Sequence, residues 1–98
     1  MKSLGFQQFK QIHMIGIGGS GMIGLATILQ KRGFKITGSD LVITPEVEEL
    51  KKLGSKVQIG HEPNLIKNAD LVVASSAISK RNPEFVFAKK LDITIIPR

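Results

Sequence analysis

A glycine-rich segment near the start of the chain has the residue types and spacing that most directly indicate chemistry. It runs from Gly16 to Gly21, reads Gly-Ile-Gly-Gly-Ser-Gly and matches the pattern G-x-G-x-x-G. An apolar run precedes it and a helix-like pattern follows, which is the context in which this pattern binds the diphosphate of a nucleotide. Glycines let backbone N–H groups approach phosphate oxygens, and the positive end of a helix dipole attracts the anion. We therefore predict a diphosphate site here, in preference to a glycine-rich turn that binds nothing.

Asp40 is a candidate for the next part of such a ligand. It lies 24 residues beyond Gly16, just after the second apolar run. An acid near this position hydrogen-bonds a ribose hydroxyl in dinucleotide-binding domains. Ser39 and Asp40 are also common turn residues, so an ordinary turn is the alternative interpretation. We favour the ribose contact.

Further polar residues are expected at the same edge of the sheet, where ligands bind in open parallel sheets. The small loop Ser75, Ser76 and Ala77 follows the fourth predicted strand, and its alternative is an ordinary connection. His61 follows the third strand, and we weigh a ligand contact and a structural role evenly for it. His13 lies inside the first strand, and we expect it to be structural.

The composition indicates one small soluble domain covering residues 1–98, because 98 residues are too few for two ordinary domains. The absence of cysteine excludes disulfides and thiolate metal sites and fits a reducing cytosol. Two histidines are too few for a histidine-based metal site, so we predict no metal. No apolar run approaches the ~18–20 residues of a membrane span, and the N-terminus lacks the apolar segment of a secretory signal. We therefore expect no membrane partner.

The chain is basic, with 14 Lys and Arg against 8 Asp and Glu, which gives a net charge of +6. The basic residues are scattered in pairs, and there is no Trp or Tyr on which single-stranded bases stack. We therefore expect no nucleic-acid partner. A positive domain is equally suited to a small polyanionic ligand.

Strand-like and helix-like segments alternate along the chain. The predicted strands span residues 12–17, 34–38, 56–59, 71–74 and 93–96, and the predicted helices span residues 21–32, 44–53 and 82–91, with at most a short helix at 62–68. The second and third helices begin with a capping residue, a proline and an acid. This alternation predicts an α/β fold with a small, doubly wound (Rossmann-like) five-stranded parallel sheet in the order 3-2-1-4-5. Because the chain stops just after the fifth strand, we expect it to be part of a longer protein.

Several motifs in sequence order resemble those of the Mur ligase family. The loop reads G-I-G-G-x-G-M, which is more specific than the glycine pattern alone, and the resemblance covers residues 12–98. The other motifs are Gly38-Ser39-Asp40, Gly60-His61, Ser75-Ser76-Ala77-Ile78 and Asn82-Pro83-Glu84. Within the family the chain is most similar to the ligases that add alanine. The related ligases that recycle murein peptides typically carry a cysteine at this loop, and this chain has none.

The resemblance implies the N-terminal domain of a three-domain cytoplasmic enzyme that uses ATP to join L-alanine to UDP-N-acetylmuramate in peptidoglycan synthesis. In that family ATP phosphorylates the muramyl carboxylate, and the amine of alanine attacks the acyl phosphate. The first domain holds the UDP, the second binds ATP and magnesium, and the third helps to hold the amino acid. Carried onto this sequence, the diphosphate would contact Gly16, Ile17, Gly18, Gly19, Ser20, Gly21 and Met22, and the uridine would contact Ser39, Asp40, His61, Ser75, Ser76 and Ala77.

This stretch lacks the family's catalytic parts. It has no G-x-x-x-x-G-K-[ST] loop for ATP and no evident acid cluster for magnesium. We therefore expect it to bind UDP-N-acetylmuramate with no cofactor of its own and no catalytic residue, while the full-length enzyme uses ATP and Mg²⁺. Two other functions stay open: an NAD(P)-binding domain of an oxidoreductase, and a regulatory nucleotide-binding module that dimerises.

Overall fold

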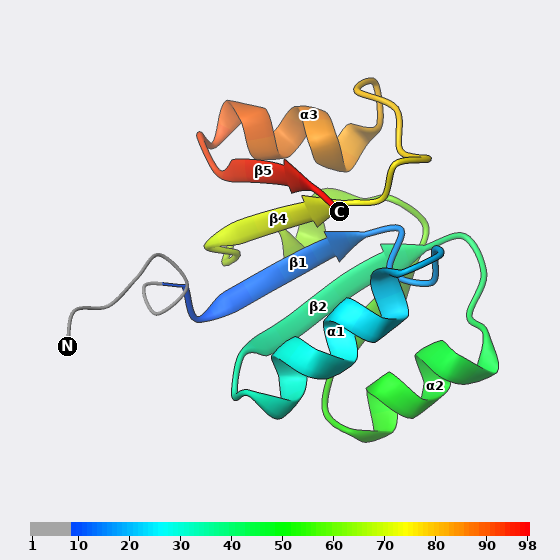
Figure 1. Cartoon of the computed structure of the whole chain (residues 1–98). Helices are drawn as coiled ribbons and strands as arrows, with labels where there is room; N and C mark the ends of the chain where they lie inside the picture. The colour runs from blue at the N-terminus through cyan, green and yellow to red at the C-terminus, as the bar shows by residue number, and fades with distance from the viewer. Residues whose placement is uncertain (1–8) are drawn as a thin grey trace, which may run out of the picture.

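The computed structural model describes residues 9–98, which form a five-stranded parallel sheet with helices on both faces (Figure 1). The strands are β1 (Gln11–Ile15), β2 (Lys35–Asp40), β3 (Lys56–Ile59), β4 (Leu71–Ala74) and β5 (Thr94–Pro97). The helices are α1 (Met22–Lys31), α2 (Pro45–Lys52) and α3 (Pro83–Lys90), with a short 3₁₀ helix η2 (Pro63–Leu65). The strand order is β3-β2-β1-β4-β5, so the predicted fold class and topology are confirmed.

Several strand boundaries differ from the prediction, and two of these differences concern the candidate site. The first strand ends at Ile15 instead of residue 17, because Gly16 adopts a φ of 79° and turns the chain out of the sheet. The second strand continues to Asp40 instead of ending at residue 38, because Ser39 and Asp40 pair with Gln58 and Ile59 of β3. Ser39 and Asp40 therefore lie in a strand and not in a turn.

The sheet separates two layers of helices, with α1 and α2 on one face and α3 on the other (Figure 1). Alternate residues of a strand point to opposite faces. Ile12 and Met14 of β1 accordingly pack in the core under α1 and α2, whereas Ile15 packs in a smaller core with Ala88 of α3. β1 is the central strand and is buried on both faces, and this places its carboxyl end at the middle of one edge of the sheet.

The helix starts fall into two kinds. In α2 the side chain of Thr44 accepts a hydrogen bond from the N–H of Val47 (3.3 Å), and in α3 the side chain of Asn82 accepts one from the N–H of Glu84 (2.8 Å). These two caps confirm the helix starts predicted from the sequence. The start of α1 is different, because Gly21 has a φ of 78°, no side chain caps the helix and no acid lies in its first turn.

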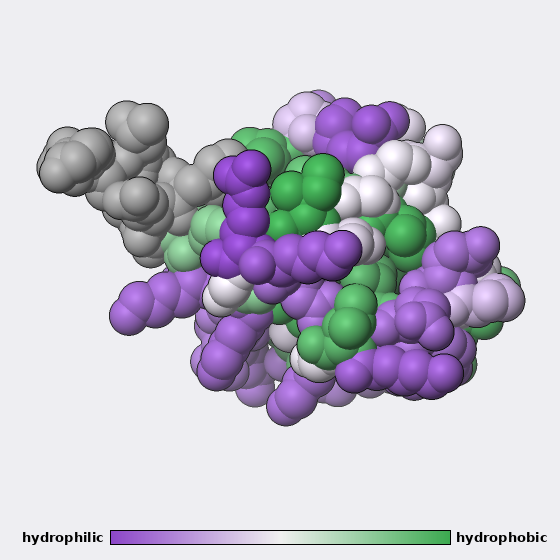
Figure 2. Space-filling model, turned by 60° about the horizontal axis from the view of Figure 1, so that its bottom comes forward, coloured by the Kyte–Doolittle hydropathy of each residue, from purple (hydrophilic) through white to green (hydrophobic). Residues whose placement is uncertain are grey.

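Figure 2 views the molecule from the side on which α1 and α2 lie, where hydrophilic side chains are interspersed with smaller hydrophobic groups. Individual apolar side chains such as Ile28 and Leu53 are exposed among the polar ones. Within the part of the chain that the structure describes, no helix has the length and apolar character needed to cross a membrane.

Candidate functional site

The glycine loop connects the end of β1 to the start of α1 and rests on the end of β2. The N–H groups of Gly16 and Ile17 donate to the carbonyl oxygen of Ser39, at 2.8 and 3.0 Å. Inside the loop the N–H of Gly19 donates to the carbonyl oxygen of Gly16, at 2.9 Å. The side chains of Ile17 and Met22 are buried, so only the backbone of these two residues can face a ligand. The loop is therefore fixed in place by the sheet before any ligand arrives.

The start of α1 leaves hydrogen-bond donors open. Among residues 9–98, no acceptor is found for the N–H groups of Ser20, Gly21 and Ile23. The first N–H groups of a helix have no partner inside the helix, and together with the helix dipole they favour an anion. Side chains cap α2 and α3, whereas no side chain caps the start of α1.

Asp40 links the end of β2 to the glycine loop. One carboxylate oxygen accepts from the N–H of Gly18 at 2.8 Å, and the other accepts from the N–H of Leu41 at 2.7 Å. A Cβ atom at Gly18 would lie 3.0 Å from the first of these oxygens, so this position has little room for a side chain. An ionised carboxylate has about four lone-pair sites, and Asp40 therefore keeps capacity for a ligand hydroxyl.

His61 belongs to a buried polar cluster that we define as His13, Thr37, Ser39, His61 and Glu84. Glu84, from the first turn of α3, is fully buried at the centre of the cluster. Its carboxylate contacts His13 Nε2 at 2.7 Å, His61 Nδ1 at 2.9 Å and the hydroxyl of Ser39. The cluster thus joins β1, β2 and the turn after β3 to α3.

The cluster also controls the charge of its carboxyl group. Burial alone would raise the pKa of Glu84, but the hydrogen bond and charge of His13, with the hydrogen bonds from Ser39 and His61, outweigh burial and lower it. Glu84 is therefore ionised at neutral pH and acts only as a hydrogen-bond acceptor. His13 is fully buried and bonded to Thr37 and Glu84, so its predicted structural role is consistent with its position.

The structure brings most of the predicted site residues to one end of the sheet but gives them different exposures. Ser75 packs against the loop, since its Oγ lies 3.1 Å from where a Cβ on Gly19 would be, and Ser76 and Ala77 beside it are exposed. Ser39 is fully buried with its hydroxyl turned toward Glu84, so its side chain can hold neighbouring site residues in place but cannot contact a ligand directly. Within residues 9–98, no group of three or more His, Cys, Asp or Glu could hold a metal ion.

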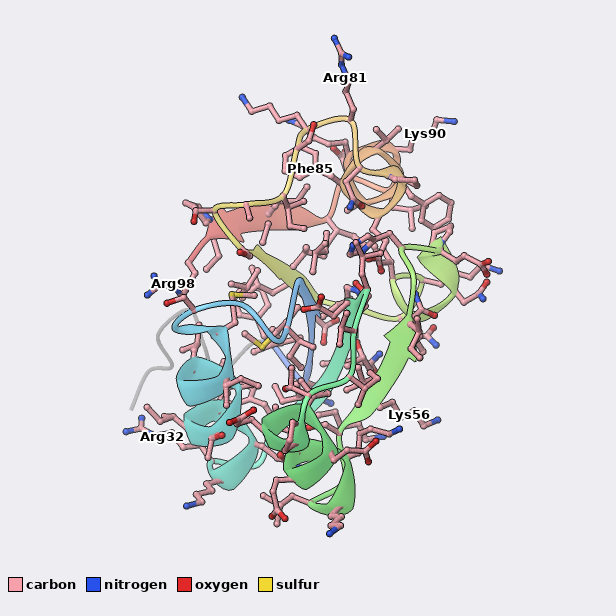
Figure 3. The ribbon with its side chains drawn as sticks, turned by 90° about the vertical axis from the view of Figure 1, so that its right-hand side faces the viewer. Arg32, Lys56, Arg81, Phe85, Lys90 and Arg98 are labelled. Carbon is pink, nitrogen blue, oxygen red and sulfur yellow. The ribbon has the colours of Figure 1, made fainter. Side chains whose placement is uncertain are left out.

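Sequence reasoning missed two residues of this region. Glu84 was interpreted as an acid favouring a helix start and as part of a family motif, without a role in the site. A histidine inside an apolar strand needs a buried partner, and that was the available signal. Arg98, just beyond β5, extends to the loop, and its Cζ atom lies 2.5 Å from where a Cβ on Gly21 would be. Figure 3 labels Arg98 beside the turn that leads into α1. Both residues come from distant parts of the chain, and no local pattern places them here.

Comparison with known proteins identifies the family. A family model described as "Mur ligase family, catalytic domain" matches residues 11–98. The chain belongs to the Mur ligase family. The resemblance seen in the sequence motifs is thereby confirmed, and the glycine loop, Asp40 and the polar cluster are features of a Mur ligase domain.

Curated relatives refine this likeness. The chain is 53% identical to the UDP-N-acetylmuramate–L-alanine ligase of Sulfurihydrogenibium sp. and 52% identical to that of Persephonella marina, over 91% of its own length in both cases. It spans about a fifth of the length of these Mur ligases, 20% and 19% respectively.

Solved structures of Mur ligases have the same fold. The UDP-N-acetylmuramate–alanine ligase of Thermotoga maritima superposes with a TM-score of 0.85 at 33% identity, covering 92% of this chain and 21% of that one. The ligase of Neisseria meningitides that acts on UDP-N-acetylmuramate and L-alanyl-γ-D-glutamyl-meso-diaminopimelate superposes with a TM-score of 0.81 at 31% identity, covering 90% of this chain and 28% of that one.

Proposed function

We propose that the chain is the N-terminal, UDP-binding domain of an ATP-dependent ligase that joins L-alanine to UDP-N-acetylmuramate in cytoplasmic peptidoglycan synthesis. The observation that carries this proposal is the uncapped start of α1 behind the glycine loop, in a chain that belongs to the Mur ligase family. Open N–H donors at a helix start are the chemistry that a diphosphate requires.

The diphosphate would lie across the loop from Gly16 to Met22, where the backbone N–H groups of Ser20 and Gly21 have no acceptor among the described residues. The guanidinium of Arg98 beside Gly21 adds a cation at the same place. A cation next to the positive end of a helix dipole is unfavourable by itself, and an anion between the two removes the conflict. Both features thus support a diphosphate at this position.

The uridine would extend from the loop toward the ends of β2, β3 and β4. Asp40 would accept a hydrogen bond from a ribose hydroxyl, and His61 with the exposed loop Ser75, Ser76 and Ala77 would line the remainder. This domain would hold and orient the nucleotide sugar and contribute no catalytic residue. The phosphorylation of the muramyl carboxylate and the attack by alanine would take place on domains that bind ATP with Mg²⁺ and the amino acid.

The choice of alanine rests on the relatives. The curated relatives compared above at 52–53% identity are alanine ligases. Among the solved structures the alanine ligase and the murein-peptide type superpose at similar identities, 33% and 31%, so the choice of alanine rests on the curated relatives. The share of the relatives that the chain covers is the reason for assigning ATP, Mg²⁺ and the amino acid to partner domains of a longer protein.

Calorimetric titration with UDP-N-acetylmuramate, UDP and NADH tests the proposal. We expect saturable binding of both uridine nucleotides and none of NADH. Binding of NADH alone would assign the chain to an oxidoreductase, and nucleotide-dependent self-association measured by ultracentrifugation would favour a regulatory module. Silence from all three ligands, both for this chain and for a longer ligase that includes it, would contradict a UDP site.

A further inference from the structure

The turn that carries His61 is held in a defined position by the backbone. Gly60 adopts a φ of 92°, and its N–H donates to the carbonyl oxygen of Asp40 at 2.8 Å. This turn returns the chain from the end of β3 across the end of β2, so that His61 meets Ser39. His61 therefore lies beside Ser39, the neighbour of Asp40 in the chain, at the end of the sheet where we propose that the uridine binds.

The two nitrogens of the His61 ring have different surroundings. Nδ1 lies 2.9 Å from Oε1 of Glu84 and 3.2 Å from the hydroxyl of Ser39. Nε2 has no hydrogen-bond partner among the described residues, and it is not one of their buried unpaired atoms, so it is accessible. The side chain as a whole is 16% exposed. His61 thus presents one ring nitrogen to the interior and the other to the outside.

A carboxylate can only accept hydrogen bonds, and this decides which ring nitrogen of neutral His61 carries the proton. The contact with Glu84 requires the hydrogen on Nδ1, which leaves Nε2 with a free lone pair. The lowered pKa of Glu84, caused by His13, Ser39 and His61 against the opposing effect of burial, keeps that carboxylate ionised at neutral pH.

We propose that Glu84 is a positioning residue that holds His61 with Nδ1 protonated, so that Nε2 accepts a hydrogen bond from an O–H or N–H donor on the nucleoside part of the bound nucleotide. This inference rests on the proposed UDP site and adds a rule of recognition to it. The accessible Nε2 accepts a hydrogen bond from a donor on the ligand, and the buried carboxylate of Glu84 fixes the tautomer of the ring.

The charged and titratable groups facing Glu84 are His13 from β1 and His61 from the turn after β3, and Thr37 and Ser39 of β2 are its polar neighbours. Because Oε2 of Glu84 accepts from His13 while Oε1 contacts His61, both oxygens of the carboxylate are held. This anchoring restricts the direction in which the His61 ring can point.

The test is a cycle of variants titrated with UDP and with pyrophosphate. Glu84→Gln keeps the shape but leaves a single acceptor oxygen in place of two and removes the charge. We expect it to weaken UDP roughly tenfold, the size of one charge-assisted hydrogen bond, and to leave pyrophosphate unchanged. His61→Ala should lose a similar factor, and the double variant should lose no more than His61→Ala alone, since residues that act through one contact are non-additive.

Asn82→Ala is the matched control for damage to α3. It removes the cap on the N–H of Glu84 while leaving the carboxylate contacts of the cluster in place. We expect Asn82→Ala to lower stability and to keep the affinity for UDP. An equal loss of affinity in Asn82→Ala and Glu84→Gln would overturn the proposal, because it would show that only the docking of α3 matters.

Nitrogen NMR of His61 reads the protonated nitrogen directly. We expect Nδ1 to carry the proton of the neutral ring form in the free wild-type chain, with a shift toward the other tautomer in Glu84→Gln. A ring protonated at Nε2 in the wild type would overturn the proposal whatever the affinities are.

Analogues identify the donor that Nε2 takes. N3-methyl-UDP lacks the imide N–H, and 2′-deoxy- and 3′-deoxy-UDP each lack one hydroxyl. The analogue whose affinity Glu84→Gln does not change is the one that lacks the donor to Nε2. If Glu84→Gln weakens the binding of all three analogues as much as that of UDP, the proposal is overturned. If wild type binds UDP and Glu84→Gln binds it equally, this inference fails while the UDP site stands. If wild type binds no UDP, the UDP site fails first and the nucleoside contact fails with it.

Discussion

The two ends of the sheet differ in what they leave unpaired. At the amino end lie two hollows of about 690 and 550 Å³, both lined among others by Gly33, Phe34 and Lys35. There Gly33 and Gly54 end α1 and α2 with positive φ, and Asp70 accepts from the N–H groups of Lys10 and Gln11. Two buried side-chain atoms near this end, Gln30 Oε1 and Ser55 Oγ, have no hydrogen-bond partner among the described residues. The carboxyl end leaves donors open at the start of α1. The carboxyl end, where we propose that the nucleotide binds, is thus distinguished by open backbone N–H donors at a helix start and not by hollow volume.

The largest effect on this contrast is expected from glycines. Gly18→Val should abolish measurable nucleotide binding, a loss of roughly a hundredfold or more. Its Cβ would lie 3.0 Å from Asp40 Oδ2 and 3.4 Å from Val47, which displaces the bond to Asp40 and blocks the approach of phosphate. The fold should stay largely intact, and calorimetry with circular dichroism measures both quantities. Unchanged affinity would remove the diphosphate assignment.

Gly33→Ala is the matched substitution at the amino end. No atom lies within 4 Å of its new Cβ, but the φ of 99° strains any side-chain-bearing residue. We expect a loss of about 1–2 kcal/mol in unfolding free energy with unchanged nucleotide affinity. A loss of affinity here would erase the distinction between the two ends.

The second contrast is between the carboxylates Asp40 and Asp70, each of which accepts two backbone N–H groups. Asp40→Ala should weaken UDP roughly tenfold and weaken pyrophosphate less, because the ribose contact is lost along with support for the loop. Asp70→Ala should leave both affinities unchanged. Titration of both ligands against both variants tests this, and equal losses of UDP and pyrophosphate in Asp40→Ala would argue against a ribose contact.

Acid should destabilise the chain through carboxylates at both ends. The pKa of Glu84 is lowered by His13, Ser39 and His61 against burial, and the pKa of Asp70 is lowered by the N–H groups of Gln11 and Lys10. A lowered pKa means stability that is present above the group's ordinary pKa, about 4, and is lost as pH falls through the lowered value.

Urea unfolding from neutral pH down to about pH 3 measures this loss. Glu84→Gln should flatten the decline more than Asp70→Asn, since Glu84 is buried and Asp70 is exposed to solvent that screens it. Identical slopes for Glu84→Gln and wild type would mean that the cluster does not favour the ionised form.

The smallest effect concerns the helix caps. Thr44→Ala removes the acceptor for the N–H of Val47 and should cost about 1 kcal/mol of unfolding free energy. Nucleotide affinity should not change, because Thr44 caps α2, whereas the proposed site lies at the uncapped start of α1. UDP titration and thermal unfolding measure the two quantities. A weakened affinity for UDP would show that the start of α2 also contributes to ligand binding.

The fold could be predicted because its signals are local. Apolar runs such as Leu71–Ala74 and the caps at Thr44 and Asn82 are fixed by neighbours in sequence, and the structure confirms them. The alternation of strands and helices then determined the parallel topology. The glycine loop was located for the same reason.

The cluster around Glu84 could not be predicted, because its geometry depends on docking. By local rules Glu84 is a solvated acid in a first helical turn, but α3 packs on the sheet and places it against His13. Ser39 and Asp40 form turns by local preference, yet pairing with β3 keeps them extended. Whether the predicted residues contact UDP stays a prediction.

The separation of the cluster's members along the chain also has a kinetic consequence. His13 and Glu84 are 71 residues apart, and contacts that close so long a loop form late, after nearer pairings have reduced the entropy to be lost. Contacts that are absent from the folding transition state slow unfolding and leave the folding rate almost unchanged. The buried carboxylate of Glu84 should therefore slow the unfolding of the folded domain. Without it the chain would fold at the same rate and unfold faster.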